Sequence, residues 1–127
     1  MINVNVLEVG SLALAYLGDS VYEVYVREHL IKLGISHVKD LQEKSLEYVS
    51  AKGQARILRR LINENVFTEE ELEVIKRARN TKCKSHSKSC DIITYHEATS
   101  FEALFGYLKL KENEERIQDI INKIFIN

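Results

Sequence analysis

The chain has 127 residues, of which 45% are hydrophobic and 29% are charged, as in an ordinary globular domain. A chain of this length buries enough surface to fold without disulfides, so we expect one domain over residues 1–127. No apolar run approaches the ~18 residues of a membrane-spanning helix, and the start lacks signal-peptide character. We therefore expect no membrane partner. Two cysteines are too few for a disulfide scaffold, so we expect a cytoplasmic protein, and the net charge of −1 excludes a uniformly basic nucleic-acid binder.

The residue pattern predicts an all-α fold. Proline is absent and glycines number only five, so the chain has little material for the turns between short strands. The first predicted helix covers residues 11–33, and Gly34 suits the position just after a helix end. Leu12, Tyr16 and Val26 recur at helical spacing, so we expect this face to turn towards the core.

Further helices follow along the chain. Ser36 is expected to cap the second helix, and Asn113 is expected to cap the last one. Thr68 and Glu71 form the pattern of a capping box, in which each side chain accepts a hydrogen bond from a free backbone amide of the other residue. The five helices are predicted at residues 36–49, 51–63, 69–79, 95–110 and 114–125.

One polar segment, residues 81–94, breaks this helical pattern. It is rich in serine and lysine, and loops of this length in a compact domain are usually functional or disordered. It also overlaps a cluster of positive charge, because residues 76–90 hold six cations and no acid. The six are Lys76, Arg77, Arg79, Lys82, Lys84 and Lys88.

An acidic residue lies in the middle of the apolar first helix. Asp19 follows Gly18 on a helix whose apolar face is expected to turn inward, and a buried carboxylate costs free energy unless it is paired, hydrogen-bonded or metal-bound. The fifth helix repeats the pattern, because Glu102 stands alone among apolar residues with Gly106 one turn later. A glycine inside a helix suggests that another backbone approaches closely there.

The two acids have three interpretations. If Asp19 and Glu102 face each other, they can share a divalent cation, and carboxylate ligands suit Mg²⁺ or Mn²⁺. Alternatively, each pairs with a separate cation such as Arg56, or Asp19 hydrogen-bonds to a neighbouring helix end. The spacing of the residues leaves all three open.

Two motifs carry a resemblance to a known family. Residues 17–21, Leu-Gly-Asp-Ser-Val, resemble the signature helix of the ribonuclease III catalytic domain, and residues 101–106, Phe-Glu-Ala-Leu-Phe-Gly, resemble its second acidic helix. Two further acids of the long enzymes are Ala15 and Thr99 here, and the chain stops at Asn127 without their double-stranded-RNA-binding domain. These departures are typical of the Mini-ribonuclease III branch, whose members are single catalytic domains.

The resemblance implies a function and a site. It implies an all-α, homodimeric ribonuclease III-like catalytic domain, with Asp19 and Glu102 as catalytic metal ligands for Mg²⁺, or Mn²⁺ in its place, and Tyr16 at the dimer interface. The implied activity is hydrolysis of double-stranded RNA to 5′-phosphate products, with the precursor of the large-subunit (23S) ribosomal RNA as substrate. Because Ala15 and Thr99 replace two acids, the alternative is a module of this fold that binds duplex RNA or a ribosomal protein without cutting.

Basic residues are the candidates for RNA contact. Binding of duplex RNA is largely phosphate neutralisation, so Lys82, Lys84 and Lys88 are expected to bind phosphates together with Arg77 and Arg79. A second basic cluster, which includes Lys52 and Arg56, lies on the third predicted helix. The alternative for both clusters is a solvated surface. The spacing of Cys83, His86, Cys90 and His96 fits no established zinc pattern, so reduced thiols are favoured.

Overall fold

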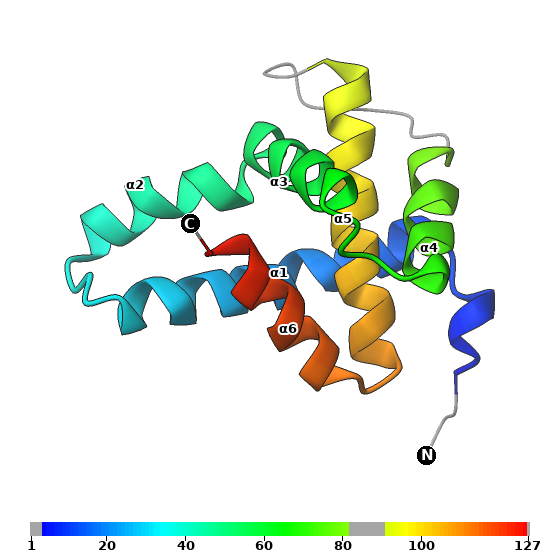
Figure 1. The fold of residues 1–127 in the computed structure, drawn as a ribbon, viewed down its shortest axis with the longest axis horizontal. Helices are drawn as coiled ribbons and strands as arrows, with labels where there is room; N and C mark the ends of the chain where they lie inside the picture. Colours follow the sequence, from blue (N-terminus) through cyan, green and yellow to red (C-terminus); the bar gives the residue numbers. More distant parts are fainter. Residues whose placement is uncertain (1–3, 82–90, 127) are drawn as a thin grey trace.

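The computed structural model describes residues 4–81 and 91–126, and these ranges contain helices and no strand (Figure 1). None of these helices is both long enough and apolar enough to cross a bilayer. The predicted all-α class is therefore confirmed. The elements are a 3-10 turn η1 (Val6–Glu8) and the helices α1 (Ser11–Lys32), α2 (Val38–Val49), α3 (Ala51–Asn63), α4 (Glu69–Arg79), α5 (Ile92–Leu110) and α6 (Glu114–Ile124).

Local side-chain chemistry sets several helix ends as the sequence predicts. At the start of α4, the Glu71 amide donates to the Thr68 hydroxyl at 3.1 Å and the Thr68 amide donates to the Glu71 carboxylate at 2.9 Å. At the start of α6, the Asn113 side chain accepts a bond from the Arg116 amide. Gly34, after α1, has a φ of 99°, which an L-residue with a side chain rarely adopts.

Two predicted helix starts are wrong. The residue before α2 is His37, not Ser36, because the His37 carbonyl accepts the first helical hydrogen bond, and no side chain caps this end. Helix α5 begins at Ile92, three residues before the predicted start. The Asp91 side chain caps it by accepting a bond from the Thr94 amide at 2.7 Å, which extends the helix back into the polar segment.

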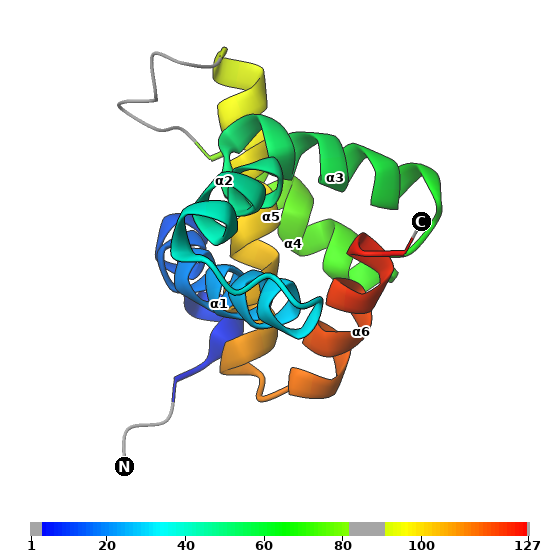
Figure 2. The ribbon, with the colours of Figure 1, turned by 90° about the vertical axis from the view of Figure 1, so that its left-hand side faces the viewer.

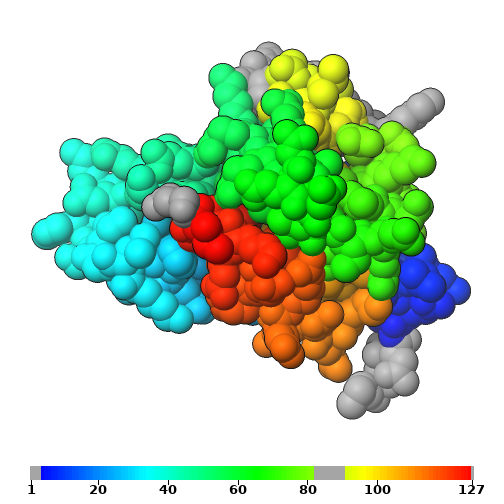
Figure 3. All heavy atoms as spheres, in the orientation of Figure 1, coloured from blue at the N-terminus to red at the C-terminus, as the bar shows by residue number. Residues whose placement is uncertain are grey.

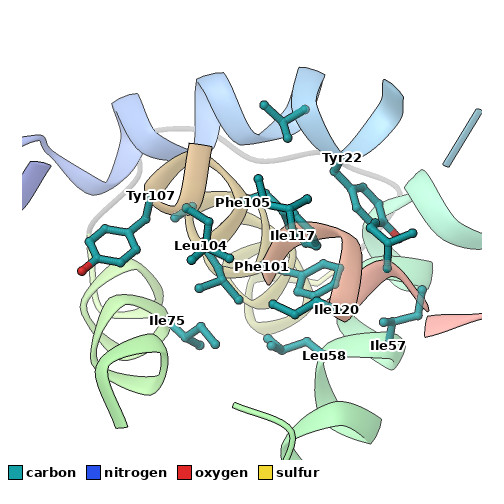
Figure 4. Close-up of a cluster of buried hydrophobic side chains, with 14 of the residues drawn as sticks. Tyr22, Ile57, Leu58, Ile75, Phe101, Leu104, Phe105, Tyr107, Ile117 and Ile120 are labelled. Atoms are coloured by element: carbon teal, nitrogen blue, oxygen red, sulfur yellow. The ribbon is translucent and has the colours of Figure 1, made fainter. Parts of the chain in front are cut away.

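Helix α5 is the centre of the fold, and α1, α3, α4 and α6 pack against it, whereas α2 packs against α1 and α3 (Figures 1 and 2). Its side chains are buried on every face along residues 98–108 apart from the half-buried Glu102, as expected of a helix enclosed by its neighbours. Phe101 and Phe105 pack edge to face at a centroid distance of 5.0 Å, and both contact the Tyr22 ring of α1 (Figure 4). In the space-filling view, α6 and α3 cover one side of this core (Figure 3).

The closest approach in the core is the crossing of α1 and α5. A Cβ atom at Gly18 would lie 1.6 Å from the backbone oxygen of Glu102, and one at Gly106 would lie 1.9 Å from that of Leu14. Both glycines are therefore required for the two backbones to touch. The close approach that the sequence predicts at these glycines is confirmed.

The expected inward face of α1 is only partly correct. Val26 is fully buried, but Leu12 is 45% exposed and Tyr16 is 85% exposed. The buried stripe of α1 follows Leu14, Gly18 and Tyr22, which contact α5, while the side that carries Leu12 and Tyr16 has no partner among the described residues of this chain. This arrangement leaves an apolar strip on the surface of α1.

Candidate active site at the crossing of α1 and α5

The glycine contact brings the two predicted acids together. Asp19 follows Gly18 on α1, and the Glu102 backbone oxygen is the atom that approaches Gly18 most closely. The Asp19 carboxyl group lies near enough to that of Glu102 to raise the pKa of Glu102. Asp19 is exposed rather than buried as expected, whereas Glu102 is half-buried. The pair therefore opens to solvent on the Asp19 side.

Neither acid has the separate cation partner that was the alternative interpretation. The ion pairs between described residues include none with Asp19 or Glu102. Arg56 instead donates to the backbone carbonyl of Glu47 at 2.9 Å. Within the described ranges, the two acids thus face each other without a neutralising side chain.

This arrangement changes the proton affinity of Glu102. Burial, followed by the hydrogen bond and the charge of Asp19, raises the pKa of Glu102 to about 8. Without a compensating charge beside it, Glu102 therefore favours its protonated form at neutral pH. A divalent cation at this position would supply a compensating positive charge.

Two residues at the site were missed by the sequence interpretation. Gln54 of α3 is 2% exposed, and its Nε2 donates to Glu102 Oε2 at 3.3 Å. Glu23 lies one turn after Asp19, and its charge contributes to the raised pKa of Glu102, although its carboxylate also pairs with Arg27 at 3.1 Å. The spacing from Asp19 to Glu23 offered a signal for Glu23. Gln54 offered none, because it is 48 residues from its partner.

The donor set at the crossing is small. No group of three or more His, Cys, Asp or Glu side chains in the described ranges is arranged to hold a metal ion. Ala15 is buried, and the Thr99 hydroxyl donates to the Tyr95 carbonyl at 3.0 Å, so neither position adds a ligand. Two carboxylates fit Mg²⁺, which keeps several waters and completes its coordination with substrate phosphates. Asp19 and Glu102 would hold it.

The predicted RNA-binding residues lie on the described surface or outside the described ranges. Lys52 and Arg56 are exposed on α3, and Arg79 is exposed at the end of α4. The Arg77 side chain donates to the carbonyls of Leu7 and Val9, so it also holds the segment before α1. Lys82, Lys84, Lys88, Cys83, His86 and Cys90 lie outside the described residues.

The remaining cations of α3 have partners within the chain. Arg59 makes a two-pronged ion pair with Glu97 of α5. Arg60 donates to the Ile124 carbonyl at 2.7 Å, at the end of α6. Of the basic cluster on this helix, Lys52 and Arg56 have no acidic partner among the described residues, although Arg56 donates to the Glu47 carbonyl.

Known proteins share this sequence and this fold. The Ribonuclease III domain family matches residues 12–113. Mini-ribonuclease 3 of Streptococcus pneumoniae is 43% identical over 122 residues, which cover 96% of this chain and 94% of the relative. Mini-ribonuclease 3 of Brevibacillus brevis is 48% identical over 114 residues, with coverage of 90% and 84%. A crystal structure of a Fusobacterium nucleatum protein superposes with a TM-score of 0.85 at 32% identity, covering 96% of this chain and 98% of the other.

The matched domain, together with the acid pair at its helix crossing, defines the class of protein. The chain belongs to the ribonuclease III family of endoribonucleases. Within that family its relatives, at 38% to 48% identity over most of the chain, are Mini-ribonuclease 3 proteins, so the resemblance to the Mini-ribonuclease III branch is confirmed.

Proposed function

We propose that this chain is a homodimeric, Mg²⁺-dependent endoribonuclease that hydrolyses double-stranded RNA, with Asp19 and Glu102 as its catalytic metal ligands. The observation that carries the proposal is the meeting of two carboxyl groups at the α1–α5 crossing without a cation partner among the described residues. Such an arrangement destabilises the fold unless a cation joins it, so its presence indicates a functional site. We propose the precursor of the large-subunit ribosomal RNA as the physiological substrate.

The residues of the site have separate tasks in this reaction. Mg²⁺, when bound, makes a water molecule nucleophilic at neutral pH and neutralises charge on the phosphate. Asp19 faces solvent and is the ligand on the substrate side, whereas the half-buried Glu102 is held from within the core. Attack of the water on phosphorus breaks the bond to the 3′ oxygen. The products carry a 5′-phosphate and a 3′-hydroxyl.

The decisive experiment uses labelled duplex RNA with and without Mg²⁺. We expect cleavage to 5′-phosphate products that requires the metal and that is lost in both Asp19→Asn and Glu102→Gln. Asp40→Asn, which changes an exposed acid of α2, is the matched control and should cleave like the wild type. Binding of duplex RNA or a ribosomal protein with no cleavage in Mg²⁺ or Mn²⁺ would contradict the proposed activity.

A homodimer through α1 is the proposed assembly. The exposed Leu12 and the 85% exposed Tyr16 support it, because they lie one turn apart on α1 and offer apolar contacts to a partner. Two sites related by a two-fold axis match the two strands of a duplex. Sedimentation should show a dimer that Tyr16→Asp weakens and that Leu46→Asp, at a 60% exposed position on α2, leaves intact. A wild-type monomer at micromolar concentration would contradict this assembly.

Cations outside the crossing are proposed to bind RNA phosphates. The sequence places Lys82, Lys84 and Lys88 in a stretch without acids, next to Arg77 and Arg79. Each neutralised phosphate releases counterions, so replacing the three lysines by alanine should weaken binding. The slope of log affinity against log salt should flatten by up to about three units. The measurement is a salt titration in Ca²⁺. Unchanged slopes would redirect the proposal to Lys52 and Arg56 on α3.

A further inference from the structure

Gln54 is a buried polar residue whose hydrogen bonds are unevenly satisfied. Its Nε2 donates to the Val49 carbonyl at 3.1 Å and to Glu102 Oε2 at 3.3 Å. Its Oε1 is buried as well, yet it has no hydrogen-bond partner in the described part of the structure. The side chain thus joins the end of α2 to the acid of α5, with one acceptor left unpaired.

The unpaired acceptor indicates that glutamine occupies this position for its donors. A buried acceptor without a partner destabilises the fold, and an apolar side chain of similar size would avoid that cost. Turning the amide over would lose the bond to Val49, because Oε1 would then face the Val49 carbonyl, which cannot donate. The donors of Gln54 therefore fix its orientation, and the bond to Glu102 is one of the two that they make with described residues.

Side chains related to glutamine would not donate to Glu102 in the same way from this position. Glutamate would add a carboxyl oxygen beside Glu102 instead of a donor, and methionine would fill the space without any donor. Asparagine is one methylene shorter, so it reaches less far from α3 towards α5. Glutamine combines the required reach with two donors and no charge.

We propose that Gln54 is a positioning residue for the metal site, which holds the Glu102 carboxylate in the orientation that binds the cation. The inference rests on the proposed function, because it assigns Gln54 a role towards a metal ligand. Glu102 sits between Asp19 of α1 and Gln54 of α3, and only Gln54 donates to it among the hydrogen bonds of the described residues. Hydrogen-bond partners of metal ligands typically change metal affinity or activity by 10- to 100-fold when they are removed.

The test compares variants of the full chain by two measurements. Gln54→Met keeps the volume and removes the donors, so the Mg²⁺ concentration for half-maximal cleavage should rise about tenfold. The maximal rate at saturating Mg²⁺ should fall by a smaller factor. Binding of Mn²⁺ without RNA, followed by electron paramagnetic resonance of the free ion, should weaken by a similar factor. Gln54→His restores one donor at similar reach and should recover part of both losses.

Tyr22→Phe is the matched control. The Tyr22 hydroxyl donates to the Tyr48 carbonyl at 2.8 Å, next to the carbonyl that Gln54 uses, but it makes no bond to Glu102. Tyr22→Phe should lower the melting temperature and leave the Mg²⁺ requirement unchanged. If Gln54→Met behaves like Tyr22→Phe, Gln54 is structural only and the inference is wrong.

Two further results separate this inference from the proposed function. If the wild type cleaves no duplex RNA at any Mg²⁺ concentration, the proposed function fails, while Mn²⁺ binding still decides the role of Gln54. If Gln54→Met does not fold, Gln54→Asn replaces it, and a wild-type metal requirement in that folded variant would overturn the inference.

Discussion

Two acids inside this fold, Glu71 and Glu102, are held in opposite ways. Glu71, in the corner between α4 and α6, is 4% exposed and accepts bonds from two nitrogens of Arg116 at 2.7 and 2.8 Å. It also accepts the Thr68 amide of the capping box. Glu102, at the crossing of α1 and α5, has another acid and one amide as its neighbours.

The difference separates structural from functional polar groups. A buried carboxylate with a cation and an amide donor is compensated, so Glu71 costs the fold little and ties α4 to α6. A carboxyl group beside a second carboxyl group is uncompensated, and the structure keeps Glu102 there at a cost in stability. Depth of burial alone would have selected Glu71, the more buried of the two acids, as the unusual one. The identity of the partner is the better guide to function.

The largest expected effect is on catalysis. Glu102→Gln and Asp19→Asn should each lower the cleavage rate about a thousandfold or more, because either change removes a proposed ligand of the metal that would activate the water. Single-turnover cleavage of a labelled duplex measures this, with circular dichroism to verify the fold. Glu71→Gln is the control, and its folded fraction should cleave at the wild-type rate. Equal losses in Glu71→Gln and Glu102→Gln would erase the distinction between the two acids.

A methyl group at the crossing should damage both stability and activity. Gly18→Ala places a Cβ where the Glu102 backbone oxygen already lies, so the two helices must separate. We expect a loss of about 3 kcal/mol or more in the free energy of unfolding, together with loss of cleavage. Urea denaturation measures the free energy of unfolding. Gly10→Ala, where the added Cβ has no atom within 4 Å, should change stability by at most about 1 kcal/mol.

A change in the α4–α6 corner should affect stability alone. Glu71→Ala removes one of the two acidic partners of Arg116, the other being Asp119, and one half of the capping box, which should cost about 2–3 kcal/mol. Arg116 keeps its bond to the Val66 carbonyl, so the loss stays below that of a fully stranded buried charge. Glu69→Ala, an exposed acid in the same first turn, should cost less than about 1 kcal/mol. Reduced cleavage per folded Glu71→Ala molecule would contradict a purely structural role.

The smallest expected effect is a difference in pH dependence. The pKa of Glu102 is raised to about 8 in the folded chain, mainly by burial and by Asp19, so folding favours its protonated form. The contribution of protonated Glu102 to the free energy of unfolding is fully present below the unfolded pKa near 4.5 and is lost as the pH rises through about 8. Glu102→Gln cannot ionise, so in EDTA its stability relative to the wild type should increase between pH 5 and 8, on the order of 1–2 kcal/mol. A constant difference across this range would show that Glu102 ionises normally.

Much of the helical framework follows from local sequence. The Thr68–Glu71 capping box, Asn113 and Gly34 mark helix ends through bonds or backbone angles that involve only near neighbours. Such interactions act within about one turn, so they can be read from spacing. The start of α2 had no such signal, because no side chain caps it, and Ser36 was a wrong choice for that reason.

The candidate site was partly visible in the sequence. Asp19 and Glu102 stand out because each acid interrupts an apolar helix, with a glycine directly before Asp19 and one turn after Glu102, and these residues also carry the family resemblance. Gln54 did not stand out, because nothing near it in the chain marks its bond to Glu102. The exposure of Tyr16 was likewise hidden, since helical periodicity shows that a face is apolar but not which neighbour covers it.

The sequence by itself thus determined which segments are helical, where most of them end, and which acids and glycines are unusual in their surroundings. Only the tertiary structure decided that α1 and α5 touch backbone to backbone at Gly18, so that Asp19 meets Glu102 and not Arg56. The physical reason is the range of the interactions involved. Capping and periodicity act between near neighbours in the chain, whereas the raised pKa of Glu102 and its bond to Gln54 depend on which helices pack together.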